Sequence, residues 1–241
     1  MAGVNAPKRI ALLDEIRGVC IYCMVFYHAF YLLGAQLQLA FCTRLFRFFE
    51  PIEIVFASAF ILISGICTQF SRSVLRRGLM LLAIALAISA VTVLLLPRFG
   101  FDAFQDRFGI LHLLSVSMLL YAALRKALDR VPVLWGAGTC IFLYISALLF
   151  VPRVSVSVPY LFALGLCNDT FYSADYFPLL PHVFVFLLGT FAGRVIRSQD
   201  LPDRYYCVHT RLFSWCGRYS LWIYLLHVPV LLFVIQLIER I

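Results

Sequence analysis

Arg17 and His28 are the residues of this 241-residue sequence whose types and spacing most clearly suggest chemistry. They stand eleven positions apart in the first long apolar segment, and eleven steps of about 100° along an α-helix end within about 20° of the starting direction. The two side chains are therefore expected on one helix face, about 16 Å apart along the axis. Asp14 lies one turn before Arg17 and can pair with it.

An ionisable side chain within a membrane span is costly unless it faces protein or water, which makes both residues candidate functional groups. A simpler role stays open for each of them. Arg17 can serve as an anchor whose charged end reaches the membrane surface. His28 can make a structural hydrogen bond inside a helix bundle.

Three further polar residues are predicted at the depth of His28, in the outer third of the bilayer: His112, Asp175 and His182. Imidazole gains and loses a proton near neutral pH, so this group favours acid–base or nucleophilic chemistry on a hydroxyl or an amine. Histidines with a carboxylate can also bind a metal ion, but the spacing matches no local metal motif and no metal is expected. His227, near the middle of the last apolar segment, is explained at least as well by a structural role.

The composition indicates that a membrane protein positions these residues. Apolar residues make up 63% of the chain and charged residues 13%, with a mean hydropathy of +0.95. Soluble domains contain about 45–50% apolar and about 25% charged residues. A transmembrane helix needs about 20 mainly apolar residues. We therefore predict an all-α, polytopic transmembrane helix bundle that forms a single domain over residues 1–241. Its seven expected spans are 11–34, 51–71, 78–96, 109–124, 133–151, 177–195 and 219–237.

The charges predict the orientation of this bundle. The side of the N-terminus collects 14 of the 20 Lys and Arg residues and five of the 12 acidic residues, which leaves +9 on that side and −1 on the other. Basic loops stay in the cytoplasm, so the N-terminus is expected inside and the C-terminus outside. The basic residues form short clusters rather than one continuous face, and we expect no nucleic acid as a partner.

The connecting segments carry three further expectations. Residues 35–50 place aromatic and basic side chains at helical spacing, which predicts an amphipathic helix at the membrane interface. Residues 152–176 form a long outer loop, which either covers a site or lies on the headgroups as an ordinary connection. Cys42 and Cys167 both face outward, so a disulfide between them stays open. Cys20-x-x-Cys23 lies on a helix in lipid and is not expected to be a redox motif.

Residues 13–18, Leu-Asp-Glu-Ile-Arg-Gly, together with His28 resemble the Arg-x₁₀-His opening of transmembrane acyltransferases. Four other stretches resemble bacterial membrane proteins related to the catalytic domain of heparan-α-glucosaminide N-acetyltransferase, and all occur in order along nearly the whole chain. They are Phe-Ile-Leu-Ile-Ser-Gly-Ile at 60–66, Phe-Gly-Ile-Leu-His at 108–112, Asp-Tyr-Phe-Pro-Leu-Leu-Pro at 175–181 and Gly-Arg-Tyr-Ser-Leu-Trp-Ile-Tyr-Leu-Leu-His at 217–227.

This resemblance implies acyl transfer from cytoplasmic acetyl-CoA to a sugar or glycan acceptor on the outer side of a bacterial cytoplasmic membrane. His28 would deprotonate the acceptor or briefly carry the acetyl group, and Asp14 would hold the CoA-orienting Arg17. His112 and Asp175 would position the acceptor or tune His28, with His182 as a further candidate. The CoA phosphates need a cationic mouth. Its expected residues are Arg17, Arg72, Arg76, Arg77 and Arg218.

The chain also departs from the family's pattern. In the human-type heparan enzyme the histidine regarded as catalytic lies in the loop after the first helix, and asparagine occupies the position that matches His28. Segment 35–50 contains no histidine here, so direct transfer with His28 as the base is favoured. Such acyltransferases commonly have ten or more spans, and a shorter chain has either lost activity or completes its site with a second copy.

Two other classes of function remain as alternatives to the enzyme. The arginines and histidines could line the path of an anionic substrate or of protons in a small transporter or channel. They could also fix the helix packing of a non-catalytic membrane assembly subunit. Binding of acyl-CoA separates the enzyme from both, and membrane lipids are expected partners in every case.

Overall fold

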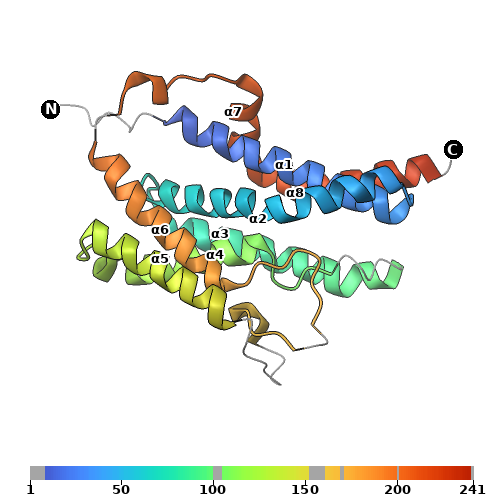
Figure 1. The fold of residues 1–241 in the computed structure, drawn as a ribbon, viewed down its shortest axis with the longest axis horizontal. Helices are drawn as coiled ribbons and strands as arrows, with labels where there is room; N and C mark the ends of the chain where they lie inside the picture. The colour runs from blue at the N-terminus through green and yellow to red at the C-terminus, as the bar shows by residue number, and fades with distance from the viewer. Residues whose placement is uncertain (1–8, 100–104, 152–160, 169–170, 200, 240–241) are drawn as a thin grey trace. The chain divides into compact units, whose positions relative to one another are not determined.

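The computed structural model describes residues 9–99, 105–151, 161–168, 171–199 and 201–239, and these residues form helices and connecting loops without a strand. Seven of the helices are long and apolar enough to cross a membrane (Figure 1). The predicted fold class and the number of spans are therefore confirmed.

The helices follow the predicted apolar segments closely, with one short helix between the last two spans. Their bounds are α1 Ala11–Gln36, α2 Ala40–Thr68, α3 Val74–Ala90, α4 Ile110–Leu128, α5 Val133–Phe150, α6 Leu179–Ser198, α7 Arg211–Arg218 and α8 Ser220–Glu239. The α3 helix continues as a π-helical turn, η1 Val91–Leu95, and a 3₁₀ turn, η2 Leu96–Phe99. Two further 3₁₀ turns are η5 Leu161–Leu164 and η6 Asp203–Tyr205.

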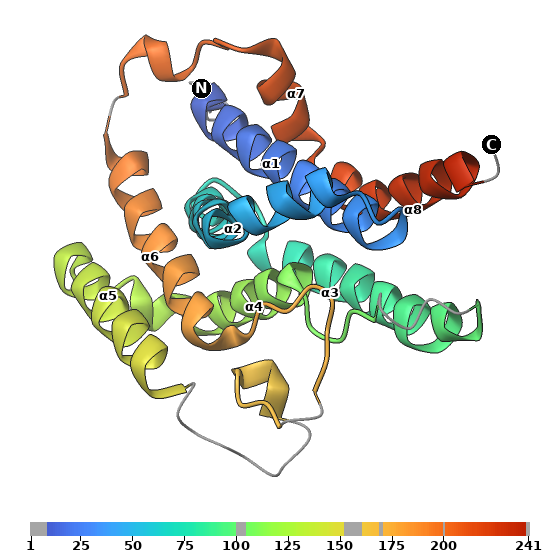
Figure 2. The same ribbon diagram turned by 45° about the vertical axis from the view of Figure 1, so that its right-hand side comes forward.

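The chain divides into two compact units, and the division falls within α2. Unit 1 comprises residues 1–63 and 200–241, and in it α1 packs against α7 and α8. Unit 2 comprises residues 64–199, where α3 packs on α4, α5 packs on α6, and α4 also contacts α6 (Figure 2).

Two glycines allow α1 and α7 in unit 1 to approach closely. A Cβ atom added to Gly18 would overlap the carbonyl oxygen of Phe213, and one added to Gly217 would overlap the carbonyl oxygen of Asp14. Backbone atoms cannot turn aside as a flexible side chain can, so each position accepts only a hydrogen in place of a side chain. The α7 helix is consequently held directly against the first turns of α1.

Residues 35–50 do not form a separate interfacial helix, and this prediction was wrong. From Ala40 onward the segment is the first part of α2, which runs through Pro51 without ending. Two of its aromatic side chains pack on α1, whereas Phe41 and Phe48 are exposed. Phe46 contacts Tyr27 with ring centroids 4.9 Å apart, and Phe49 stacks on Phe30 at 6.0 Å.

In unit 2, helices α4 and α6 supply the most deeply buried large side chains. Tyr121 on α4 is 1% exposed and Phe186 on α6 is fully buried. Serine and threonine accompany them: Ser115, Ser117 and Thr190 are also almost completely buried. Ser115 and Thr190 donate their hydroxyls to carbonyls three residues earlier in their own helices, at 2.8 and 2.7 Å. Local bonds of this kind satisfy hydroxyls within an apolar bundle.

The long segment after α5 contacts the N-terminal end of α4. Residues 152–160 and 169–170 lie outside the described part of the chain. Among the others, Phe162 in η5 lies 6.5 Å from the Phe108 ring, and its carbonyl accepts the Tyr176 hydroxyl at 2.6 Å. All eight cysteines are free thiols.

Candidate functional site

Arg17 in unit 1 lies on the face of α1 that packs against α8. Its Nη2 donates to the hydroxyl of the buried Ser220 at 3.2 Å, and its guanidinium lies over the Phe60 ring, 5.4 Å from the centroid. The Nε–H group is buried without a hydrogen-bond partner in the described structure. A buried donor that lacks a partner is uncommon in native proteins and calls for an explanation.

His28 lies on the same face of α1 and meets His227 of α8. The two imidazole rings are 5.0 Å apart between centroids and inclined at 62°. His28 Nδ1 lies 3.0 Å from the Met24 carbonyl, and His227 Nδ1 lies 2.6 Å from the Tyr224 carbonyl. Because a carbonyl only accepts, both Nδ1 atoms carry the hydrogen, and each neutral ring keeps a lone pair on Nε2. The predicted shared face of Arg17 and His28 is thus confirmed.

Asp14 binds a different arginine from the one predicted. Its carboxylate is 6% exposed and accepts two hydrogen bonds from Arg9, one of them from Nη2 at 2.9 Å. Arg9 precedes the first turn of α1, where a long side chain can fold back onto a carboxylate, while Arg17 turns toward α8. The expected pair of Asp14 with Arg17 is therefore corrected.

Glu15 fastens the start of α7 to α1. Its Oε1 accepts the backbone N–H groups of His209 and Thr210, at 2.6 and 2.8 Å, just before α7 begins. Its Oε2 lies 3.4 Å from His209 Nδ1. Helix N-terminal N–H groups favour a carboxylate partner, and Glu15 therefore serves the packing of unit 1.

A second polar cluster surrounds the N-terminal end of α4 in unit 2. Backbone hydrogen bonds join the segments on either side, from Ala174 N to the Gln105 carbonyl at 2.8 Å and from Phe177 N to the Phe108 carbonyl at 3.1 Å. They bring Asp106 and Asp175 together over Gly109. A Cβ atom on Gly109 would lie 2.8 Å from Asp106 Oδ2 and 2.7 Å from Asp175 Oδ2.

Asp106 is the acidic residue that the sequence analysis did not single out. It is 8% exposed, and burial, followed by the neighbouring charge of Asp175, raises the pKa of Asp106 to about 8. Its carboxylate accepts the Ser173 hydroxyl at 3.5 Å. The motif that contains His112 begins two residues later, at Phe108. This short separation in sequence is the feature that could have identified Asp106 as a site residue.

His112 uses both ring nitrogens within this cluster. Its Nδ1 accepts the backbone N–H of Gly109 at 3.2 Å, so the hydrogen of the neutral ring is on Nε2. Nε2 lies 3.3 Å from the Ser89 hydroxyl, which donates in turn to the Asp106 carbonyl at 2.7 Å. His112 therefore holds the start of α4, and the cluster contains it together with Asp175.

His182 has the arrangement of His28 rather than that of His112. Its Nδ1 donates to the Pro178 carbonyl at 3.1 Å, and its Nε2 is buried without a partner in the described structure. The ring also meets Phe177 at 5.5 Å. His28, His182 and His227 consequently share one pattern, with Nδ1–H bound to the preceding turn and Nε2 available as an acceptor.

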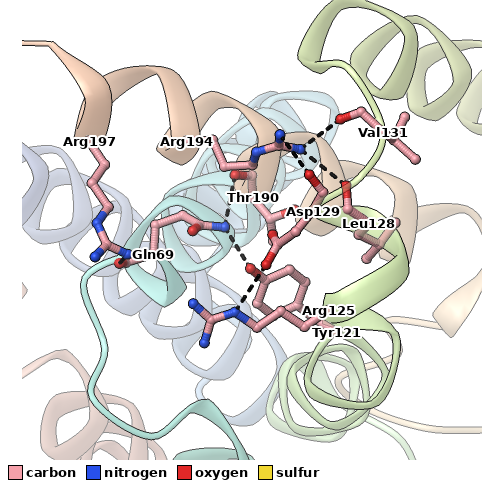
Figure 3. A network of polar contacts seen from close by, with 9 residues as sticks. All are labelled: Gln69, Tyr121, Arg125, Leu128, Asp129, Val131, Thr190, Arg194 and Arg197. Carbon is pink, nitrogen blue, oxygen red and sulfur yellow. Dashed lines mark hydrogen bonds and ion pairs between the residues drawn. The ribbon is translucent and has the colours of Figure 1, made fainter.

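The arginines expected at the cationic mouth are mostly exposed: Arg72, Arg76 and Arg218 are exposed and Arg77 is half-buried. Two arginines of α6 in unit 2 have structural contacts instead (Figure 3). Arg194 donates to the carbonyls of Leu128, Asp129 and Val131 at 2.9–3.2 Å, and Arg197 donates to the Gln69 carbonyl at 3.1 Å. Arg194 thereby supplies hydrogens to three carbonyls at the turn between α4 and α5.

The comparison with protein families matches residues 9–229 to the family described as heparan-alpha-glucosaminide N-acetyltransferase, catalytic. The chain belongs to this family. The match includes every predicted site residue of both units. No curated protein and no solved structure matches the chain. Membership of this N-acetyltransferase family implies a transmembrane acetyltransferase-like enzyme, and the seven apolar helices make it an integral membrane protein.

No group of three His, Cys, Asp or Glu residues in the described ranges of this family member is arranged to hold a metal ion. The contact of His28 with His227 was not predicted, because counting residues along each helix does not give the angle at which two helices cross. Ser220 was missed for a similar reason. Its only sequence signal was its place in the 217–227 stretch.

Proposed function

We propose that this chain transfers an acetyl group from cytoplasmic acetyl-CoA to a hydroxyl or amine of a sugar or glycan acceptor on the outer side of a bacterial cytoplasmic membrane. The observation that carries the proposal is the face of α1 toward α8. On this face Arg17 contacts Ser220 and His28 contacts His227, and the family match adds the class of reaction.

His28 is the base in this proposal. Its Nε2 lone pair takes the proton of the acceptor O–H or N–H while the acceptor oxygen or nitrogen attacks the thioester carbonyl carbon. The new bond to that carbon forms and the carbon–sulfur bond breaks. The proton on His28 then passes to the CoA thiolate, so the reaction ends with an acetylated acceptor, CoA and a neutral histidine.

Arg17 fits the role of orienting acetyl-CoA. Its buried Nε–H lacks a partner in the described structure, and a phosphate or carbonyl oxygen of the ligand would satisfy that donor. The exposed Arg72, Arg76 and Arg218, together with Arg77, would attract the CoA phosphates. Asp14, which is occupied by Arg9, would support this end of α1 without touching the ligand.

The proposal assigns the acceptor to the polar residues at the N-terminal ends of α4 and α6. His112 and Asp175 belong to a hydrogen-bonded cluster that would give the acceptor a fixed surface. His182 keeps a free Nε2 that can accept a hydroxyl hydrogen. The family match covers the residues of both units.

Thermal unfolding of the purified protein with and without CoA or acetyl-CoA tests the donor. A ligand that binds only the folded state raises its stability, so both compounds should raise the melting temperature. Arg17→Gln should remove the shift, whereas Arg130→Gln, at an exposed arginine near the end of α4, should keep it. A wild-type protein whose melting temperature responds to neither compound would contradict the enzyme and leave the transporter and the assembly subunit as the alternatives.

The acceptor and the base are tested in proteoliposomes with acetyl-CoA on one side and glucosamine, a neutral glycan or a lipid-linked saccharide on the other. His28→Asn should keep the thermal shift but lose about 10²-fold or more in transfer, the usual contribution of a general base. Unchanged transfer in His28→Asn would remove His28 from the mechanism. Acetylation of one acceptor and not the others identifies its class.

A further inference from the structure

Of the two ring nitrogens of His227, a buried residue of unit 1, only one has a hydrogen-bond partner in the described part of the chain. Nδ1 donates to the Tyr224 carbonyl, while Nε2 is buried without a partner in the described residues. A buried acceptor without a hydrogen-bond partner destabilises the folded state. An apolar side chain would fill the same position without that cost, so a purely structural role does not account for the histidine.

The neighbour that could use the free nitrogen is His28. The ring centroids are 5.0 Å apart, and no hydrogen bond joins His227 Nε2 to the His28 ring in the described structure. A turn of the rings that brings the two Nε2 atoms face to face would leave room for one N–H···N hydrogen bond of about 2.8 Å. Both Nδ1–H groups are already bound to backbone carbonyls. Any proton that the pair exchanges must therefore pass between the two Nε2 atoms.

The two histidines differ in accessibility, and the difference separates their roles. His28 is half-buried, whereas His227 is 8% exposed and its Nε2 has essentially no accessible surface. A ligand can reach the His28 ring, while His227 lies behind it. Two positive charges on imidazoles at this separation repel each other. Beyond the hydrogen on each Nδ1, the pair would therefore bind one additional proton and not two.

We infer that His227 is a positioning residue of the acetyl transfer that acts through His28 by holding the proton which His28 removes from the acceptor. The inference rests on the proposed function and adds a second proton-binding group to it. The proton leaves His28 Nε2 as the His227 Nε2–H bond forms, and His28 is again neutral while the tetrahedral intermediate collapses. The proton then returns through His28 to the CoA thiolate, which leaves both rings as they began.

The other ionisable groups around the pair come from all three packed helices. On α1, Tyr27 precedes His28 and Arg17 lies three turns earlier. On α2, Glu53 is hydrogen-bonded to Tyr27, and Glu50 is close enough to act on the same hydroxyl. On α8, the Tyr224 ring lies 5.6 Å from His227. Among the imidazoles of the described residues, the one in contact with His28 is that of His227.

The test combines histidine titration with turnover. In protein labelled at its five histidines and placed in phospholipid nanodiscs, NMR should show His28 and His227 titrating in two linked steps in the wild type. In His227→Gln, His28 should titrate in a single step. Transfer, measured as release of CoA at saturating acceptor, should fall about 10²-fold in kcat, with little change in the KM for acetyl-CoA and an altered pH profile.

His209→Gln, at an exposed loop histidine, should leave both the linked titration and turnover unchanged. His227→Asn is the second variant, in case His227→Gln does not fold. An unchanged His28 titration in these variants, or an unchanged kcat and pH profile, overturns the inference. The thermal shift with acetyl-CoA reports on the proposed function separately, because linked titration without any shift would support the pair and contradict the enzyme.

Discussion

Asp106 and Asp175 direct carboxylate oxygens at the same point, and a Cβ atom on Gly109 would lie within 2.8 Å of both. Asp106 is buried there, and its pKa of about 8 means that the folded chain keeps a proton which the unfolded chain loses near pH 4. Between these two pH values the folded state binds more protons than the unfolded state. Its stability must therefore fall as the pH rises, by at most about 1.4 kcal/mol per pH unit.

Asp106→Asn should remove most of this dependence. The amide keeps an oxygen for the Ser173 hydroxyl but has no proton to lose, so the variant should equal the wild type near pH 4 and exceed it near pH 8. The measurement is thermal unfolding in detergent from pH 4 to 9. Asp129→Asn, at an exposed aspartate after α4, is the control. Parallel curves for wild type and Asp106→Asn would show that Asp106 does not hold the proton.

Gly18→Ala should destabilise unit 1 because the new methyl group would meet the backbone of Phe213. Overpacking costs about 1–3 kcal/mol, and separation of α7 from α1 would add the loss of the Glu15 contacts. Gly138→Ala is a matched control, since its Cβ would have no heavy atom within 4 Å outside its own helix backbone. That change should raise stability by about 0.5–1 kcal/mol through helix propensity. Equal melting temperatures for the two variants would refute the close contact of α1 with α7.

The spans could be predicted because a helix that crosses a bilayer must have a minimum length and an apolar composition, and both can be read directly from the sequence. The error at residues 35–50 arose at Pro51. Proline often marks the start of a helix, but here α2 continues through it, and the packing of Phe46 and Phe49 on α1 decides the outcome. Long-range packing of this kind has no local signal.

The site was predictable along one helix but not between helices. Helical periodicity alone placed Arg17 and His28 on one face. It could not indicate that Asp14 pairs with Arg9 rather than with Arg17. The path of the chain before α1 decides which arginine side chain lies close to the carboxylate. The different tautomers of His112 and His182 depend on whether a backbone N–H or a carbonyl faces Nδ1, and that is a property of the folded chain.

Arg194→Gln should lower the melting temperature of the protein. The guanidinium supplies hydrogens to three carbonyls around the end of α4 and lies over the Phe191 ring at 5.6 Å, and glutamine is too short to replace these contacts. Hydrogen bonds from a charged donor contribute about 1.5–3 kcal/mol where they are buried, so a partly exposed group should contribute about 1–3 kcal/mol in total. Thermal unfolding beside Arg130→Gln measures this effect, and equal losses in both variants would mean that only the lost charge matters.

Gln69 joins the end of α2 to α4 and α6 within unit 2, and its coupling to Tyr121 can be measured (Figure 3). Its Nε2 donates to the Tyr121 hydroxyl at 2.7 Å and to the Thr190 carbonyl at 3.2 Å, and all these groups are buried. Tyr121→Phe removes one acceptor and should cost about 1–2 kcal/mol, because the Gln69 amide then loses a hydrogen bond without gaining water. Gln69→Leu should cost as much or more.

The double variant Gln69→Leu with Tyr121→Phe decides whether these losses belong to one hydrogen bond. Residues in direct contact should show a coupling of at least about 0.5 kcal/mol, so the double variant should be more stable than the sum of the single losses predicts. Simple additivity would indicate that the two side chains contribute independently. The same unfolding curves should show a smaller effect for Ser198→Ala, since that exposed hydroxyl bonds only to Val195 of its own helix.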